Sequence, residues 1–201
     1  MIKAIIFDYG NVIQKVNDDI FLNKIVKKSD KNYDYTINFI FASGLHNRFE
    51  LGKIQPQEFF STIKKELNLK MPQAEFFRTY NSKLFQKIET TINLIKKLKK
   101  LYKIVLLSNT NKINFEYISK TFEVSPLFDV ITLSFEVGSL KPDKKIYLDS
   151  LNKLNLKPSE CVYIDDIKEY SDAASKIGIH GIHYTSYKNL IKELKKLNVK
   201  I

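Results

Sequence analysis

Short apolar runs rich in β-branched residues alternate along this chain with longer stretches in which apolar residues recur at helical spacing. In one such stretch, Leu94, Leu98 and Leu101 share a single helix face. Short runs that alternate with helices indicate right-handed βαβ units and a parallel sheet with helices on both faces. The sequence therefore predicts an α/β fold whose strands lie at Ile2–Phe7, Ile104–Leu107, Val130–Leu133, Val162–Ile164 and Ile179–His183.

One interval, from about Gln14 to Glu89, breaks this alternation because it carries helical patterns and no convincing strand. Its length of about 75 residues is too great for a simple crossover between strands. We therefore expect a helical cap, residues 14–89, over the carboxyl end of the first strand, and an α/β core made of residues 1–13 and 90–201. The cap helices are predicted at Ile20–Val26, Tyr33–Phe41, Gln57–Leu67 and Gln73–Phe85.

Polar residues stand after four of the five apolar runs. Asp8 follows the first run, Ser108–Thr110 follow the second, Lys141 comes after the third, and Asp165–Asp166 follow the fourth. Ligands bind outside the carboxyl ends of strands in an open parallel sheet. The sequence therefore predicts a reactive crevice in which a hydroxyl, an ammonium group and three carboxylates meet.

These residue types suit a phosphate ester. Carboxylates from neighbouring strands offer the oxygen ligands that Mg²⁺ prefers. Ser108 and the backbone N–H groups of Asn109 and Thr110, at the start of a helix, can hold phosphate oxygens. Lys141 would lower the pKa of Asp8 and offset the phosphoryl charge. Asp8 could then attack phosphorus and form an aspartyl-phosphate.

Composition narrows the classes of partner. The chain has 33 basic and 22 acidic residues, a net charge of +11, and one cysteine, Cys161, so it has no internal disulfide. The basic residues are almost all Lys, spread over the polar sides of predicted helices, which favours a solvated surface over a nucleic-acid site. No apolar stretch reaches the roughly 20 residues of a membrane span. We expect a cytoplasmic protein, monomeric or weakly dimeric, with a small phosphorylated molecule as its partner.

Four ordered motifs resemble those of the haloacid dehalogenase superfamily, and the resemblance covers the whole chain. They are Phe7–Ile13, Leu106–Thr110, Gly138–Pro142 with Ile146–Tyr147, and Tyr163–Asp166 with Ala173–Ala174 and Gly178. The sequences of these motifs are most similar to those of the branch of small sugar-phosphate phosphatases. The resemblance implies a Rossmann-like core with an inserted small cap, and hydrolase activity that depends on Mg²⁺.

The resemblance also implies roles for individual residues. Asp8 would be the nucleophile and a metal ligand, and Gly10 would offer its backbone carbonyl to Mg²⁺. Ser108 and Lys141 would hold the phosphoryl group. Asp165 would be the metal carboxylate, with Asp166 acting beside it directly or through water.

The main departure from the family pattern is Gly10, which stands where most phosphatases of the superfamily carry an acid/base Asp. General acid–base help is worth about 10²–10⁴ in rate. A substrate with an acidic leaving group, such as a glycosyl 1-phosphate, would lose least. In the cap, His46, Arg48 and Glu50 resemble the family stretch that approaches the substrate; they are predicted to bind a sugar or to replace the missing acid, unless they form a solvated helix end.

Two other functions stay open at this point. A 2-haloacid dehalogenase would use an Asp nucleophile without metal, but the Asp165–Asp166 pair would repel an anionic substrate there. A catalytically weak, phosphate-binding regulatory module would account for Gly10. Asp166 also has a structural alternative, because an Asp in this place can cap the next helix.

Overall fold

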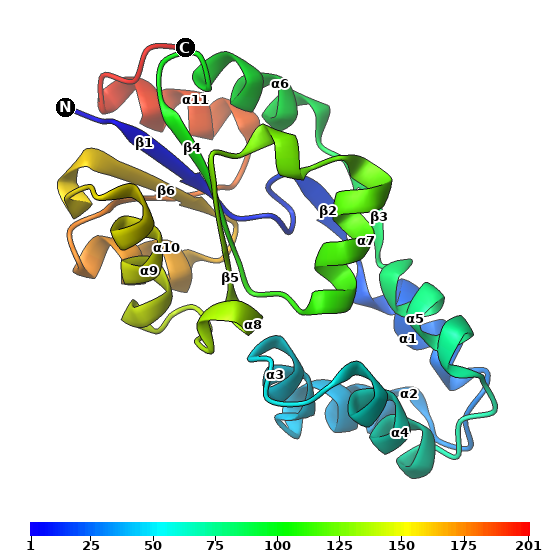
Figure 1. Cartoon of the computed structure of the whole chain (residues 1–201). Coiled ribbons are helices and arrows are strands. Elements are labelled where there is room, and N and C mark those ends of the chain that lie inside the picture. The colour runs from blue at the N-terminus through cyan, green and yellow to red at the C-terminus, as the bar shows by residue number, and fades with distance from the viewer.

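The computed structural model describes residues 1–201 and is built around a parallel five-stranded sheet of order β5-β4-β1-β6-β7 (Figure 1). Each neighbouring pair in this sheet is parallel. The α/β fold predicted from the alternating pattern is therefore confirmed, and each of the five predicted runs overlaps one strand. The strands are β1 (Ala4–Phe7), β4 (Lys103–Ser108), β5 (Val130–Leu133), β6 (Cys161–Asp165) and β7 (His180–His183).

Helices cover both faces of this sheet, and the two faces have separate apolar cores. Ile5 and Phe7 of β1 belong to the larger cluster, with Leu94 and Leu190 from two helices. The alternate residues of β1 join the smaller cluster, since side chains on a strand point to opposite faces in turn. The helices of the core are α6 (Glu89–Leu98), α7 (Lys112–Phe122), α8 (Ser134–Val137), α9 (Lys144–Leu154), α10 (Lys168–Lys176) and α11 (Tyr187–Lys196).

Five short helices lie beyond the carboxyl end of the sheet and pack around an aromatic core of their own (Figure 1). Phe49 and Phe59 stack at 4.2 Å between ring centroids, and Phe21 and Phe76 meet edge to face. The five helices are α1 (Asp18–Val26), α2 (Tyr33–Ile37), which continues as a π-helical turn (Asn38–Ala42), α3 (Leu45–Glu50), α4 (Pro56–Glu66) and α5 (Gln73–Asn81).

No helix in the structure is both long and apolar enough to cross a membrane.

The expectation that this interval lacks strands is wrong. β2 (Gln14–Val16) and β3 (Leu84–Lys87) form an antiparallel ribbon through which the chain enters and leaves the helical segment. The predicted fourth helix accordingly ends at Asn81, and Leu84 and Phe85 belong to β3. Both strands are very short and mostly polar, so they carry none of the apolar alternation that marks a strand in a sequence.

Candidate active site

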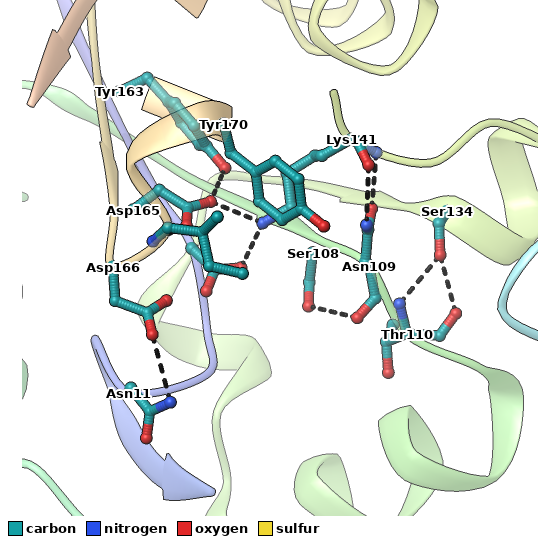
Figure 2. A network of polar contacts seen from close by, with 12 residues as sticks. Asn11, Ser108, Asn109, Thr110, Ser134, Lys141, Tyr163, Asp165, Asp166 and Tyr170 are labelled. Carbon is teal, nitrogen blue, oxygen red and sulfur yellow. Dashed lines mark hydrogen bonds and ion pairs between the residues drawn. The ribbon is translucent and has the colours of Figure 1, made fainter. Parts of the chain in front are cut away.

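A cavity of about 270 Å³ opens at the carboxyl ends of β1, β4 and β6, on the side of the sheet that faces the helical segment. Nearly all the predicted site residues line it, together with residues from the helical segment. Figure 2 shows the core side of this site, where side chains from four separate motifs converge. The predicted residues at the cavity wall are Asp8, Gly10, His46, Glu50, Ser108, Asn109, Thr110, Lys141 and Asp166.

Lys141 forms a buried ion cluster with two of the carboxylates. Its Nζ lies 2.6 Å from Asp8 Oδ1 and 2.7 Å from Asp165 Oδ2, and its side chain is 2% exposed. Burial alone would lower the pKa of Lys141, but these two carboxylates outweigh it and raise that pKa. The ammonium group therefore stays charged and fixes Asp8 in place.

Asp8 follows the fully buried strand β1 and points its second oxygen, Oδ2, toward Gly10. Burial raises the pKa of Asp8 to about 7, and Asp165 adds to the rise while Lys141 opposes it. Gly10 carries no positive φ, and its carbonyl accepts the Val12 N–H at 2.7 Å in a tight turn. A carboxylate that shares a buried site with a cation and further carboxylates is suited to nucleophilic or metal-binding chemistry.

The two acidic residues after β6 occupy different positions. Asp165 is fully buried behind the cavity, where Oδ2 accepts bonds from Lys141 and the Tyr163 hydroxyl and Oδ1 accepts the Ile167 N–H at 2.8 Å (Figure 2). Asp166 lies at the cavity wall, and its Oδ2 accepts a hydrogen bond from Asn11 at 3.2 Å. The carboxylate that reaches the cavity from this pair is therefore Asp166, whereas the sequence favoured Asp165.

The acidic residues fit a hard divalent cation. One oxygen each from Asp8, Asp165 and Asp166 lies within 4.8 Å of the others. Asp165 has three partners inside the protein, whereas the Asp8 and Asp166 carboxylates line the cavity and are the more accessible to a cation. An all-oxygen set with few carboxylates matches the preference of Mg²⁺, which keeps part of its coordination for water and substrate oxygens.

The loop after β4 completes the core side of the cavity. Ser108 ends the strand, and Asn109 clamps the backbone of Lys141 through two hydrogen bonds, at 2.8 and 3.2 Å. The Thr110 N–H donates to Ser134 Oγ at 2.9 Å. This N–H is therefore not a free donor for a phosphate, contrary to the expectation from sequence, although Thr110 itself lines the cavity.

His46 and Glu50 reach the cavity from α3, where they lie one helical turn apart. Burial lowers the pKa of His46, and its Nε2 pairs with the Tyr80 hydroxyl at 2.8 Å. Arg48 is not brought to the cavity. The Arg48 side chain is more than half exposed and lies 3.5 Å from Glu58. Because Arg48 is two positions from both His46 and Glu50, its side chain points to another side of the helix.

Sequence reasoning missed two charged residues that line the cavity, Asp18 and Lys83. Lys83 Nζ lies 3.1 Å from Asp18 Oδ1 and 4.4 Å from the centre of the Tyr80 ring. Asp18 stands just after β2 and Lys83 just before β3. The signal that could have found them is the ribbon itself, which brings Asp18 and Lys83 together at the cavity that Asp8 also lines.

Comparison with curated proteins finds phosphatases whose sequence identity to this chain is low but whose alignments cover most of it. The chain is 26% identical over 176 residues to D-ribitol-5-phosphate phosphatase of Bacteroides thetaiotaomicron, which covers 83% of this chain and 84% of the relative. It is also 26% identical over 198 residues to the sesquiterpene phosphatase astK of Aspergillus oryzae, covering 97% and 96% of the two chains. The first match thus covers more than four fifths of each chain, and the second covers nearly all of each chain.

Solved structures and a family model agree with these relatives. A crystal structure of a HAD family enzyme from Bacteroides thetaiotaomicron superposes with a TM-score of 0.86 at 25% identity, covering 94% of this chain and 98% of that one. The same enzyme has been solved with magnesium and inorganic phosphate. Residues 2–178 match the model of the haloacid dehalogenase-like hydrolase family. The sheet with its strand-end carboxylates is therefore that of a haloacid dehalogenase-like hydrolase, and the chain belongs to this family.

Proposed function

We propose that this hydrolase is a Mg²⁺-dependent phosphatase that acts on a small phosphorylated metabolite, such as a sugar phosphate, through an aspartyl-phosphate on Asp8. One observation carries the proposal. The Asp8 carboxylate lies in the cavity wall with the Lys141 ammonium 2.6 Å away, the Asp166 carboxylate beside it and the Ser108 loop in the same wall. This combination offers a nucleophile, positive charge for phosphoryl oxygens and ligands for a cation.

Each residue has a proposed role within this function. Asp8 is the nucleophile, and Lys141 and Ser108 hold the phosphoryl oxygens. Asn109 positions the Lys141 backbone. The Asp8 and Asp166 carboxylates and the Gly10 carbonyl would hold Mg²⁺, with Asp165 orienting Lys141 behind them. When bound there, Mg²⁺ would neutralise charge on the phosphoryl group.

The cavity supports a small polar substrate. Its volume of about 270 Å³ lies at the lower end for ligand pockets, and only six of its nineteen lining residues are hydrophobic. A polyol or sugar carries hydroxyls that Asp18, Glu50 and Lys83 can bind, whereas a terpenoid chain would need a longer apolar wall. This favours a substrate like that of the ribitol phosphate relative over one like that of the terpenoid relative. Among sugar phosphates, a glycosyl 1-phosphate has the leaving group that needs least protonation.

The two alternatives are less well supported. A metal-free dehalogenase would bring an anionic substrate against three neighbouring carboxylates that only one ammonium group offsets. A binding module without catalysis would gain nothing from a carboxylate in the cavity wall beside Lys141 and Ser108, since Asp8 would repel a bound phosphate there. A panel of phosphate esters and 2-haloacids, assayed with and without Mg²⁺, separates the three. Phosphate release only with Mg²⁺ supports the phosphatase, halide release supports the dehalogenase, and neither product supports the binding module.

Removal of the metal should silence the enzyme. EDTA is expected to stop phosphate release, added Mg²⁺ should restore it, and Asp166→Asn should weaken the apparent affinity for Mg²⁺ by about tenfold or more. The physical reason is that Asp166 supplies a charged oxygen at the cavity wall. Mg²⁺ titrations followed by activity and by calorimetry measure the effect. Asp172→Asn, which changes an exposed carboxylate on α10, is the matched control. Full activity in EDTA would contradict the metal assignment.

A further inference from the structure

The cavity has no obvious acid beside the nucleophile. When a phosphate ester is cleaved, the departing oxygen must take up a proton unless it is already a good leaving group. Residue 10, two positions after Asp8, is glycine and has no side chain to give one. The proton must therefore come from another group that lines the same cavity.

Glu50 is held against the core at this cavity by two contacts from α8. Ser134 Oγ lies 2.7 Å from the Glu50 backbone oxygen and 2.9 Å from the Thr110 nitrogen, so it joins Glu50 to the loop after β4. Two residues later, a Cβ on Gly52 would stand 2.5 Å from the Phe135 carbonyl oxygen, which shows how closely the backbones approach. In Figure 1 the helix α3 that carries Glu50 faces α8 at the edge of the core.

The Glu50 side chain is 17% exposed and makes no hydrogen bond within the protein, and His46 Nδ1 stands 3.8 Å from its Oε2. On this geometry we propose that Glu50 donates the proton to the leaving oxygen and afterwards takes a proton from the attacking water. The assignment rests on the proposed phosphatase function and deepens it. Glu50 would then do from the helical segment what residue 10, a glycine in the turn after β1, cannot do.

Three other titratable groups of the cavity wall, Lys83, His46 and Tyr170, are poorly suited to this task. Lys83 is paired with Asp18 at 3.1 Å. Burial lowers the pKa of Lys83, but the neighbouring Tyr80, Asp18 and Glu50 outweigh burial and raise it, so Lys83 keeps its proton. His46 is buried, which lowers its pKa and leaves the ring neutral, and its Nε2 is taken by Tyr80. Burial also raises the pKa of Tyr170. These groups hold their protons too tightly or have none to give near neutral pH.

Charges from several elements act on Glu50. Burial raises its pKa to about 7, Lys83 and Lys141 oppose this rise, and Asp18 adds to it, while the neighbouring His46 is neutral. An acid works best when its pKa lies near the working pH, because it is then often protonated and still gives up its proton readily. Since the acid must start protonated, its contribution falls as the pH rises through about 7.

The two half-reactions balance with Glu50 in this role. In the first, an Asp8 oxygen forms a bond to phosphorus, the bond from phosphorus to the leaving oxygen breaks, and that oxygen takes the electron pair and the Glu50 proton. In the second, water attacks phosphorus and gives a proton to the Glu50 carboxylate. The bond between Asp8 and phosphorus then breaks, which frees phosphate and returns both residues to their starting states.

The test compares two esters within one protein preparation. Glu50→Gln should lower kcat/KM for an alkyl phosphate such as a polyol phosphate by about 10²-fold or more. The same variant should change kcat/KM for p-nitrophenyl phosphate by less than about threefold, because this constant covers only the steps up to departure of the leaving group, and that leaving group departs without a proton. The ratio of the two rates cancels any loss of folded protein and any change common to both esters, such as a change in Mg²⁺ binding. In the wild type this alkyl-to-aryl ratio should fall as the pH rises above about 7, and the variant should lose that dependence.

Glu58→Gln is the matched control, since Glu58 lies on the neighbouring helix α4 with a side chain that is 53% exposed. Equal losses on both esters, or no loss on the alkyl ester, would overturn the role of Glu50 and leave the phosphatase proposal standing. A wild type that hydrolyses neither ester with Mg²⁺ would overturn the phosphatase proposal and the Glu50 assignment together.

A second variant asks whether the defect is a missing proton. Gly10→Asp in the Glu50→Gln background should recover much of the alkyl phosphate activity. The backbone can carry a side chain at this position, because a Cβ at Gly10 would meet Val16 Cγ2 at 3.5 Å and Asp8 Oδ2 at 3.8 Å, both ordinary contacts. An alkyl-to-aryl ratio that stays at the Glu50→Gln value in the double variant would contradict proton donation as the role of Glu50.

Discussion

Replacing Asp8 by Asn should lower the turnover of every phosphate ester by at least about 10⁴-fold, because an amide oxygen is a poor nucleophile and cannot form the aspartyl-phosphate. The change is nearly isosteric, and Lys141 keeps its second partner, Asp165, at 2.7 Å. We therefore expect the variant to fold. Steady-state kinetics with and without Mg²⁺ measure the loss, and intact-protein mass spectrometry after acid quenching should show a phosphoryl adduct on the wild type alone.

Asp34→Asn is the control for this variant, since it removes an exposed carboxylate on α2, remote from the cavity wall. Its turnover should equal that of the wild type. Retention of even a tenth of the wild-type activity by Asp8→Asn, with an unchanged circular dichroism spectrum, would remove Asp8 from the mechanism.

Lys141→Met should affect both activity and stability. Phosphate binding should weaken because the variant lacks the cation beside the nucleophile. Stability in EDTA should fall by about 3–5 kcal/mol, the usual cost of leaving a buried charge without its partner. Asp8 and Asp165 are both buried and would face each other without the ammonium group.

The stability loss should depend on pH, with a sign that follows from Asp8. Burial raises its pKa from 3.8 to about 7, so the stability linked to protonated Asp8 is present below 3.8 and lost as the pH rises through about 7. Lys141 opposes that rise, and its removal should raise the pKa of Asp8 further. Urea unfolding should therefore show a larger deficit near pH 8 than near pH 5. A deficit that is equal at both values would mean that removal of Lys141 does not change the pKa of Asp8.

Much of the core could be predicted from the sequence because four of its five strands lie at apolar runs that are followed by polar candidate site residues. The strand β1 shows why this works: Ala4 to Phe7 are fully buried, and the next residue, Asp8, is the first that can reach the cavity. Parallel strands bring such residues to one edge of the sheet, so the convergence of Asp8, Ser108 and Lys141 follows from topology.

The rest of the site depended on long-range contacts that leave little trace in a local pattern. Lys83 and Asp18 reach the cavity only because β2 pairs with β3, and that pairing joins segments far apart in the sequence. Asp165 and Asp166 make different contacts because Lys141, which belongs to another motif, bonds to Asp165. The direction of the Arg48 side chain, in contrast, follows from helix periodicity. His46 and Glu50 are one turn apart and share a face of α3, and a residue midway between them lies on another face.

The antiparallel ribbon also makes the helical segment a separable module. Val16 and Leu84 are paired residues, so the two points at which the chain leaves and rejoins the core lie only about one strand spacing apart, near 5 Å. Any inserted segment whose ends meet at that spacing can be joined there without moving β1 or the carboxylates behind it. Exchanging this segment between relatives should therefore transfer preference for the alcohol part of a substrate together with the proposed acid, Glu50, while Asp8, Ser108 and Lys141 remain with the core.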